Sequence, residues 1–279
     1  MVTEQGRLAD AVLASRAPMD PSVVTALLRA PQRWSVTHVR QTGSTNADLA
    51  SGPDIPHGRV LVTEEQVAGR GRSGRDWFCP PGAGLMFSAL LRLPAIPADR
   101  RGWTGAALGL AIVRALDGIG ITAQLKWPND VLIDGRKCAG ILGEVAGGAV
   151  VIGTGINISL IPAELPRSDA TSLWLSAPAD IVELLDRNTL LAAILDNFGD
   201  LLDRWVAARG DVEASGLRAE YRRVCATIGS RVRLQLPGGA ELLAEAVDIA
   251  TDGSLIVLDD GGRRATYSAA DVVHLRPGH

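Results

Sequence analysis

Apolar and polar residues alternate along several short stretches in the first part of the chain, a pattern typical of strands with one buried face. The alternation is clear over residues 34–40, 59–65 and 84–93, where β-branched and apolar side chains dominate. Apolar residues recur with helical spacing over residues 103–116 and from the N-cap Asn188 to residue 208. The pattern therefore predicts strands interleaved with a few amphipathic helices.

Two tight turns connect antiparallel strands in the middle of the chain. The dipeptide Asp134-Gly135 joins residues 131–134 to residues 136–145, and Gly147-Gly148 leads into residues 149–159. Such hairpins need no crossover helix, in contrast to the parallel pairs of a doubly wound sheet. We therefore predict an α+β fold with a central mixed or antiparallel sheet flanked by helices.

A helix is predicted over residues 212–225. After Thr227 the residue pattern changes from helical spacing to short β-rich segments. Short β-rich segments are separated there by Pro237-Gly238-Gly239, Asp252-Gly253 and Gly261-Gly262, which are typical of tight turns. This pattern predicts a small separate β-barrel. Its predicted strands cover residues 231–236, 242–250, 255–258, 263–267 and 272–275. The predicted parts of the chain are a leader with a short helix (1–33), a first domain (34–226) and the barrel (227–279).

Composition narrows the functional classes. The 279 residues are 47% hydrophobic and 21% charged, as in ordinary soluble globular proteins. A net charge of −3 leaves no overall basic field for nucleic acid or lipid, and the sequence has neither a signal peptide nor a membrane span. Three cysteines without metal-ligand spacing fit a reducing cytoplasm. The 33 residues before Trp34 are too few for a DNA-binding domain with a linker, so we expect no DNA partner.

The most unusual segment is the glycine- and arginine-rich stretch Gly69-Arg70-Gly71-Arg72-Ser73-Gly74-Arg75. Glycine permits close approach of the backbone to a ligand, and arginine offers a fixed fork of donors for carboxylate or phosphate. The stretch therefore predicts a mobile loop that closes over an anion. Taken alone, it is more typical of a solvated linker or a nucleic-acid-binding tract, so other residues must decide.

Two polar clusters elsewhere in the sequence favour the anion-binding loop over the other two interpretations. Ser44 or Thr45 can cap a helix that begins at Asn46, and the same groups can hydrogen-bond a buried polar ligand. Asp130, at the end of Lys-Trp-Pro-Asn-Asp, lies on the hairpin arm opposite Lys137. A carboxylate facing an amine in this way suits the chemistry of Mg²⁺ and phosphate. The alternatives are a simple turn and a cross-strand salt bridge that contributes little stability.

Four motifs, in this order, resemble those of the biotin protein ligases. They are Gly-Arg-Gly-Arg-x-Gly-Arg-x-Trp from Gly69, Lys-Trp-Pro-Asn-Asp from Lys126, Gly-Arg-Lys-x-x-Gly-Ile-Leu from Gly135 and Gly-x-Gly-Ile-Asn from Gly153. The resemblance covers residues 34–225 and, more loosely, the C-terminal part. It implies a class II synthetase-like catalytic domain followed by an SH3-like barrel.

The resemblance also implies a two-step reaction. Biotin and MgATP give biotinyl-5′-adenylate and pyrophosphate, and biotin then passes to one lysine of a biotin carboxyl carrier domain. The implied carriers belong to biotin-dependent carboxylases of the acetyl-CoA, acyl-CoA or pyruvate carboxylase type. Lys137, Arg72 and Asp130 would act in catalysis, and Asp130 and Asn129 would hold Mg²⁺. The implied nucleotide-binding residues are Arg72, Arg75, Trp77, Lys126, Asn129, Lys137, Gly155 and Asn157. The implied biotin-binding residues are Ser44, Thr45, Asn46, Gln66, Gly69, Arg70, Gly71, Arg72, Lys137 and Gly140.

Two other functions stay open from the sequence. A lipoate or octanoyl ligase of the same fold is the nearest alternative, although the arginine–glycine loop and Trp-Pro-Asn-Asp favour biotin. A nucleic-acid-binding module ranks last, because the chain is net acidic and only 4% aromatic. The pattern does not decide between a monomer and a weak dimer.

Overall fold

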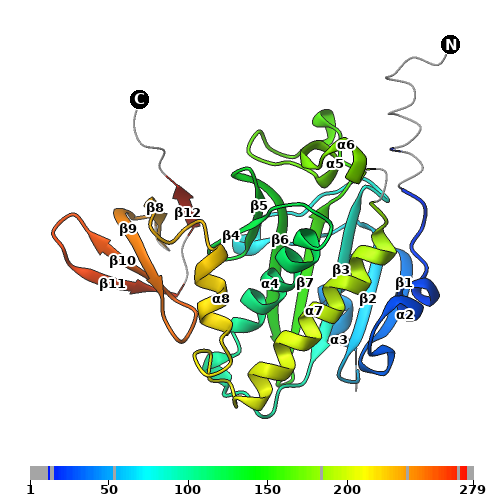
Figure 1. The fold of residues 1–279 in the computed structure, drawn as a ribbon, viewed down its shortest axis with the longest axis horizontal. Helices are drawn as coiled ribbons and strands as arrows, with labels where there is room; N and C mark the ends of the chain where they lie inside the picture. The colour runs from blue at the N-terminus through cyan, green and yellow to red at the C-terminus, as the bar shows by residue number, and fades with distance from the viewer. Residues whose placement is uncertain are drawn as a thin grey trace.

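Within the residues that the structure describes, the chain forms two β-sheets (Figure 1). The structure, a computed structural model, describes residue 12 and residues 16–52, 55–182, 185–236, 239–268 and 271–274. The larger sheet has the strand order β1-β2-β3-β7-β6-β5-β4. The first two strands run parallel and all other neighbours are antiparallel, so the sheet is mixed, as predicted. Its strands are β1 (Ser35–Thr42), β2 (Arg59–Gln66), β3 (Gly84–Leu91), β4 (Gln124–Lys126), β5 (Asp130–Ile133), β6 (Arg136–Ala146) and β7 (Ala149–Asn157).

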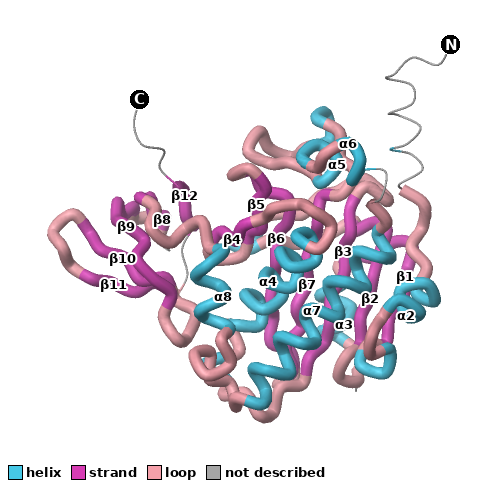
Figure 2. The backbone as a smooth tube through the Cα atoms, viewed as in Figure 1, coloured by secondary structure: helices cyan, strands magenta, loops and turns pink. Residues whose placement is uncertain are grey.

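Helices cover both faces of this sheet (Figures 1 and 2). Neighbouring residues of β7 point to opposite faces of the sheet. Their contacts therefore show which helices cover each face. The side chain of Ile152 reaches toward Gly105 of α4 (Trp103–Asp117), whereas Gly153 lies against Asn46 of α3 (Thr45–Ser51). The long helix α7 (Arg187–Ala207) packs beside α4 on the first of these faces. The remaining α-helices whose bounds lie in the described part of the chain are α2 (Pro21–Leu27), α5 (Leu173–Ser176), α6 (Ala179–Val182) and α8 (Leu217–Val224).

The main hydrophobic core lies between the sheet and the layer of α4 and α7. Its largest fully buried side chains include Phe87, Leu108 and Trp205. The small residues of α4 allow this close packing, because a Cβ atom at Gly109 would lie 3.0 Å from the Leu125 side chain. None of the described helices is both long and apolar enough to cross a membrane.

Two predicted helix starts are wrong. The N-cap of α7 is Asp186, whose carboxylate accepts the Thr189 N–H, and the predicted cap Asn188 lies inside the first turn. The helix predicted from Val212 begins only at Leu217. The Asp211 carboxylate accepts two backbone N–H groups and holds residues 211–215 in turns, and Gly216 then adopts a left-handed conformation (φ 74°).

The second sheet is antiparallel throughout and is smaller, with the order β11-β10-β9-β8-β12. It adjoins the first domain through two indole groups, since Trp103 Nε1 donates to Thr251 O and Trp127 Nε1 to Gly253 O, each at 2.9 Å. Its strands agree with the predicted ones within a few residues, except that Leu275 lies outside the described residues. They are β8 (Arg231–Gln235), β9 (Glu241–Ile249), β10 (Leu255–Asp259), β11 (Arg264–Tyr267) and β12 (Asp271–His274).

Candidate active site

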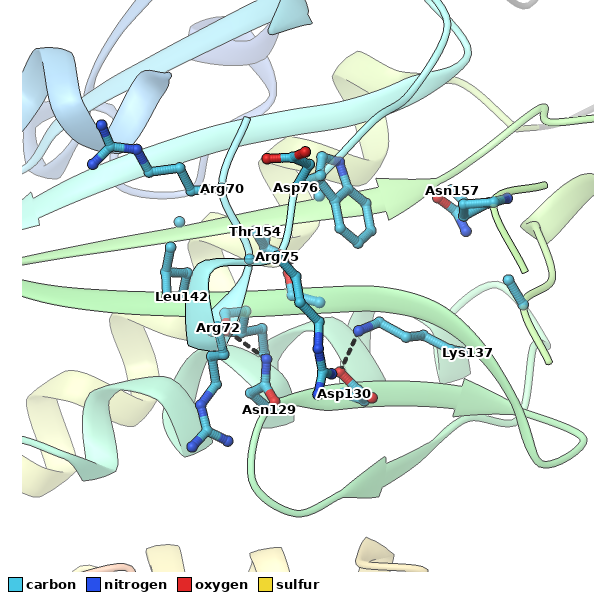
Figure 3. A pocket seen from close by; sticks show the side chains of 18 of the residues that line it. Arg70, Arg72, Arg75, Asp76, Asn129, Asp130, Lys137, Leu142, Thr154 and Asn157 are labelled. Carbon is cyan, nitrogen blue, oxygen red and sulfur yellow. Dashed lines mark hydrogen bonds and ion pairs between the residues drawn. The ribbon is translucent and has the colours of Figure 1, made fainter. Parts of the chain in front are cut away.

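A cavity of about 360 Å³ lies on the face of the large sheet that carries α3 (Figure 3). It is lined by residues from nearly every motif that the sequence singled out. Of the predicted site residues, Gly69 is the exception and lies behind the cavity wall, where a Cβ atom would meet the Trp77 carbonyl at 2.4 Å. The predicted residues in the wall are Ser44, Thr45, Asn46, Gln66, Arg70, Gly71, Arg72, Arg75, Trp77, Lys126, Asn129, Asp130, Lys137, Gly140, Gly155 and Asn157.

One end of the cavity is built from the start of α3 and is neutral and polar. Ser44 is the N-cap of this helix, and its hydroxyl oxygen accepts the Ala47 N–H. The amide oxygen of Gln66, at the end of β2, accepts the Thr45 N–H at 2.8 Å. Ser44 and Thr45 are almost completely buried. Their hydroxyl groups are therefore held at fixed positions in the wall of the cavity.

Two residues that the sequence analysis did not single out support this end, Ser88 in the cavity wall and Glu144 outside it. Ser88 is fully buried in β3 and donates a hydrogen bond of 2.6 Å to Asn46 Oδ1. Glu144 on β6 accepts from Asn46 Nδ2 at 2.8 Å. Ser88 had a signal in the sequence, since it is the one polar side chain in the apolar stretch Gly84–Leu91. Glu144 had none, because only the strand order brings it to α3.

The arginine–glycine loop forms a small hydrogen-bonded turn beside the cavity. Arg70 and Asp76 make an isolated antiparallel bridge, and the Gly71 N–H donates to Arg75 O at 2.6 Å. A single turn of 3₁₀-helix, η2 (Arg72–Gly74), lies at the tip. In Figure 3, the side chains of Arg72 and Arg75 extend toward the side of the cavity that holds Asn129 and Asp130, whereas Arg70 points away from it. The loop thus brings cations to one end of the cavity.

Trp77 follows this loop and lies flat against glycine backbone. A Cβ atom at Gly155 would meet the Trp77 ring at 2.3 Å, so glycine at this position is what leaves room for the indole. The Lys137 ammonium lies 5.9 Å from the centre of the ring, within cation–π range. The indole Nε1–H is buried and has no hydrogen-bond partner within the described part of the chain. This donor is therefore available to a bound molecule.

The predicted pairing of Asp130 with Lys137 is present. The two side chains form an ion pair of 2.6 Å (Figure 3). The residues are not directly opposite in the ladder, because Asp130 pairs with Gly140 and Leu132 with Lys137, with a β-bulge between Val131 and Leu132. Nearby, burial lowers the pKa of the Lys126 amine, and the carboxylate of Asp130 opposes this effect.

Further segments close the cavity beyond this cluster. Asn157 is buried at the end of β7, and its amide donates to Thr171 O at 2.9 Å. The wall also includes Gln235, Val272 and Val273 from the C-terminal sheet. Nothing in the sequence near these three residues indicates a site, because contact between the two sheets leaves no local pattern.

The donors around Asp130 fit a magnesium ion. Asn129 Nδ2 donates to Ile141 O, which leaves the Asn129 amide oxygen as a possible ligand beside the Asp130 carboxylate. Within the described residues, no group of three or more histidine, cysteine or acidic side chains could hold a metal ion. One carboxylate and one amide oxygen suit Mg²⁺, which usually keeps several waters and shares phosphate oxygens with its substrate.

Comparison with known proteins places this geometry in a family. Residues 36–160 match the biotin/lipoate A/B protein ligase family, and residues 227–275 match the biotin protein ligase C-terminal domain. The chain is 42% identical over 274 residues to the biotin–[acetyl-CoA-carboxylase] ligase of Mycobacterium tuberculosis, covering 94% of this chain and 97% of that protein. It is 32% identical to the bifunctional ligase/repressor BirA of Bacillus subtilis, over 82% of this chain and 70% of that protein.

A solved structure supports the same fold. The biotin protein ligase from Aquifex aeolicus in complex with biotin and ATP superposes with a TM-score of 0.72 at 24% identity, covering 87% of this chain and 99% of that one. The predicted α+β architecture with a small C-terminal β domain is therefore confirmed. With two family matches along its length and a relative this similar over nearly all of it, the chain belongs to the biotin protein ligase family.

Proposed function

We infer that this chain is a biotin protein ligase, which activates biotin with ATP and transfers it to a lysine of a biotin carboxyl carrier protein. The observation that carries this conclusion is the division of one cavity into a neutral hydrogen-bonding end and a cationic end. Biotin has the matching division, since its ureido ring is neutral and polar and its carboxylate is the reacting group. Family membership supports the same activity.

We assign the neutral end to the ureido ring. The Ser44 hydroxyl oxygen accepts the Ala47 N–H, so its proton is free to point to a ligand carbonyl oxygen. Gln66 Nε2 makes only a weak contact of 3.7 Å with the Met86 sulfur and can donate to the same oxygen. Neutral donors in a buried wall suit a neutral ligand group, because no charge has to lose its water.

The cationic end suits the first chemical step. A biotin carboxylate oxygen attacks the α-phosphorus of ATP, the bond from this phosphorus to the bridging oxygen breaks, and pyrophosphate leaves. Because both reactants are anions, the barrier falls when fixed cations neutralise the approaching charges. Lys137 and Arg72 are placed for this task, Arg75 extends toward Asp130 beside them, and Lys126 is a further cation in the cavity wall. Mg²⁺ bound at Asp130 and Asn129 would supply further positive charge to the phosphate oxygens when present.

The second step transfers the biotinyl group. The neutral amine of the carrier lysine attacks the acyl carbon, the bond from this carbon to the phosphate oxygen breaks, and AMP leaves with the electron pair while the amine loses a proton. Water would hydrolyse the same mixed anhydride, so the intermediate has to be shielded until the carrier arrives. We assign this shielding to the loop from Gly69 to Asp76, which lies over the cationic end.

We extend the proposal to partners and location. The carboxyl carrier protein of acetyl-CoA carboxylase is the expected substrate, and carriers of the pyruvate carboxylase type are a further candidate. A cytoplasmic location fits the free, buried thiols of Cys79, Cys138 and Cys225. We expect a monomer or a weak dimer, which sedimentation at several protein concentrations would distinguish.

The test is direct biotinylation. The protein is incubated with biotin, MgATP and an apo carrier domain, and the carrier is analysed by mass spectrometry. We expect one biotinyl group on one lysine, and none on a carrier in which that lysine is arginine. An unmodified carrier, together with no biotin-dependent exchange between ATP and pyrophosphate, would contradict the proposal.

A lipoate ligase is the competing function, since the matched family includes both classes. Offering biotin and lipoate together in the exchange assay separates them. We expect exchange with biotin and at most a trace with lipoate, because the neutral end would have its polar groups unpaired against an apolar dithiolane ring.

A further inference from the structure

The hydrogen bonds around Asn46 fix the orientation of its side-chain amide. Asn46 Nδ2 faces two groups that can only accept, Leu142 O at 3.1 Å and the Glu144 carboxylate at 2.8 Å. The amide nitrogen must therefore point to β6. The amide oxygen consequently points the other way, toward Ser88.

The orientation of Asn46 determines the proton of the Ser88 hydroxyl. The Asn46 oxygen cannot donate, so at 2.6 Å the single Ser88 proton must lie between the two atoms. A Cβ atom at Gly153 would lie 2.2 Å from Asn46 Oδ1 and 2.6 Å from Ser88 Oγ. Glycine at that position therefore leaves room for this hydrogen bond.

The direction of the Thr45 hydroxyl proton follows from that of Ser88. It lies 2.7 Å from Ser88 Oγ, whose own proton is already used, so Thr45 must donate this hydrogen bond. The longer contact of 3.1 Å from Thr45 Oγ1 to Gln66 Oε1 then has no proton of its own, and Gln66 Oε1 accepts the Thr45 backbone N–H instead. With its one proton committed, the Thr45 hydroxyl can only accept a hydrogen bond from a molecule in the cavity.

We propose that Ser88 and Glu144 are positioning residues for biotin, which act through Asn46 to hold the Thr45 hydroxyl as an acceptor for one ureido N–H. This inference rests on the proposed function and concerns the same cavity. The chain Glu144–Asn46–Ser88–Thr45 transmits donor and acceptor character from the far side of α3 to the ligand. It selects a ring that carries N–H at this point and disfavours one that carries an acceptor atom.

The experiment compares biotin with two cyclic carbamate analogues, each with one ureido N–H replaced by oxygen. Calorimetry gives the affinity of each compound for the wild-type chain and for the variants. In the wild type, one analogue should bind at least about tenfold more weakly than the other, because its ring oxygen faces an oxygen that cannot donate. In Ser88→Ala the Thr45 proton loses its 2.7 Å acceptor and has only the longer contact to Gln66 Oε1 at 3.1 Å within the chain, so it can turn to the ligand, and we expect this difference to shrink to about threefold or less.

Variants of Glu144 test the distant end of the chain. Glu144→Ala should reduce the discrimination less than Ser88→Ala, because Leu142 O still holds the Asn46 amide. Glu144→Gln should restore it, since its amide oxygen can accept the same hydrogen bond. The matched control is Glu65→Ala, which removes a carboxylate that accepts from the Gln41 amide at 2.8 Å at the surface. This control should discriminate like the wild type.

The outcomes separate the two proposals. Full discrimination in Ser88→Ala would overturn the positioning role alone, as would an equal loss of affinity for all three compounds with a lower melting temperature. A wild-type chain that binds no biotin would overturn the proposed function and this inference with it. Retained ATP affinity in every variant, with discrimination lost in the predicted order, would support the positioning role.

Discussion

The two ends of the cavity are built in opposite ways. At the neutral end, the residues Thr45, Asn46 and Ser88 are at most 5% exposed, and regular elements hold their side chains in a closed set of hydrogen bonds. At the cationic end, the Lys137 side chain is 33% exposed and its Asp130 partner 20%, and a glycine-rich loop brings in the arginines.

The difference follows from the cost of removing each kind of group from water. Neutral polar groups can be buried completely once their hydrogen bonds are made, which gives a rigid and selective wall. Charged groups lose far more free energy on burial, so they stay near solvent and pair with one another until a ligand arrives. The neutral end can therefore be finished before binding, whereas the cationic end has to exchange its internal ion pair for contacts with phosphate.

Loss of the Lys137 ammonium should have the largest effect and should be confined to the cationic end. We expect Lys137→Ala to slow adenylate formation by about 10²- to 10³-fold, because a fixed cation no longer stabilises the transition state. Biotin affinity should fall only a few-fold. Pyrophosphate release and calorimetry measure the two effects. Arg136→Ala, which removes an exposed cation from the neighbouring position, is the control. Near-normal pyrophosphate release from Lys137→Ala would end the assignment.

A substitution at the neutral end should have the opposite effect and impair biotin binding alone. Gln66→Leu leaves the Thr45 N–H without its acceptor and removes a donor from the cavity. We expect biotin affinity to fall by about ten- to hundredfold while ATP affinity stays unchanged. Gln41→Leu, which removes a surface amide, should bind both ligands normally. If Gln66→Leu weakened ATP as much as biotin, the division of the cavity into two ends would be wrong.

The loop allows a kinetic test of the same division. Arg72→Gly should release biotinyl-adenylate about tenfold faster, because the loop loses the guanidinium that we expect to bind the phosphate of the intermediate. The amount of intermediate that stays with the protein through gel filtration measures this release. Arg72→Lys, which keeps the charge but not the fork of donors, should fall between the variant and the wild type. Tight retention by Arg72→Gly would show that the loop does not shield the intermediate.

The smallest expected effect concerns pH and the C-terminal sheet. Burial, with the nearby Lys126 charge, lowers the pKa of His274 to about 4 from its ordinary value of 6.5, so the folded state holds the ring neutral between these values. Between these values the unfolded chain binds more protons, and stability must fall as the pH drops from 6.5 toward 4. We expect His274→Gln to flatten the dependence of the melting temperature on pH over this window by on the order of 2 °C.

Protonation of His274 should also affect the two ends of the cavity differently. His274 Nε2 lies 3.0 Å from Thr227 Oγ1. The same oxygen accepts the backbone N–H of Trp127, beside the cationic end. Acid should therefore weaken ATP binding before biotin binding in the wild type. An equal decline for both ligands would argue against a specific link between His274 and the cationic end.

The sequence was informative wherever function depends on local order. Alternating residues located β1, β2 and β3, tight turns located β5, β6 and β7, and the four motifs contain twelve of the sixteen predicted residues that line the cavity. It was uninformative wherever strands far apart in the chain meet. Glu144 reaches Asn46 because β6 lies beside β7, and nothing near residue 144 indicates this. The roles of the individual site residues and the boundary at residue 227 stay predictions.

Helix starts failed for a different reason. Asp186 and Asn188 lie two residues apart and both have side chains that cap helices, so local preference alone cannot choose between them. The choice is made by tertiary contacts, since the Asn188 amide oxygen accepts the Asp20 N–H from the segment before α2. Sequence reasoning had no access to that contact.

The hydrogen bonds of Trp127 give the C-terminal sheet a thermodynamic relation to the reaction. The Trp127 backbone N–H donates to Thr227 Oγ1, and its indole Nε1–H donates to Gly253 O. Its neighbours in the chain line the cationic end. If the docked sheet increases the affinity of this end for ATP by some factor, bound ATP must favour docking by the same factor. Amide protons of β9 and β10 should then exchange more slowly in the presence of ATP. The small sheet would in this way report on the occupancy of a site to which it contributes few side chains.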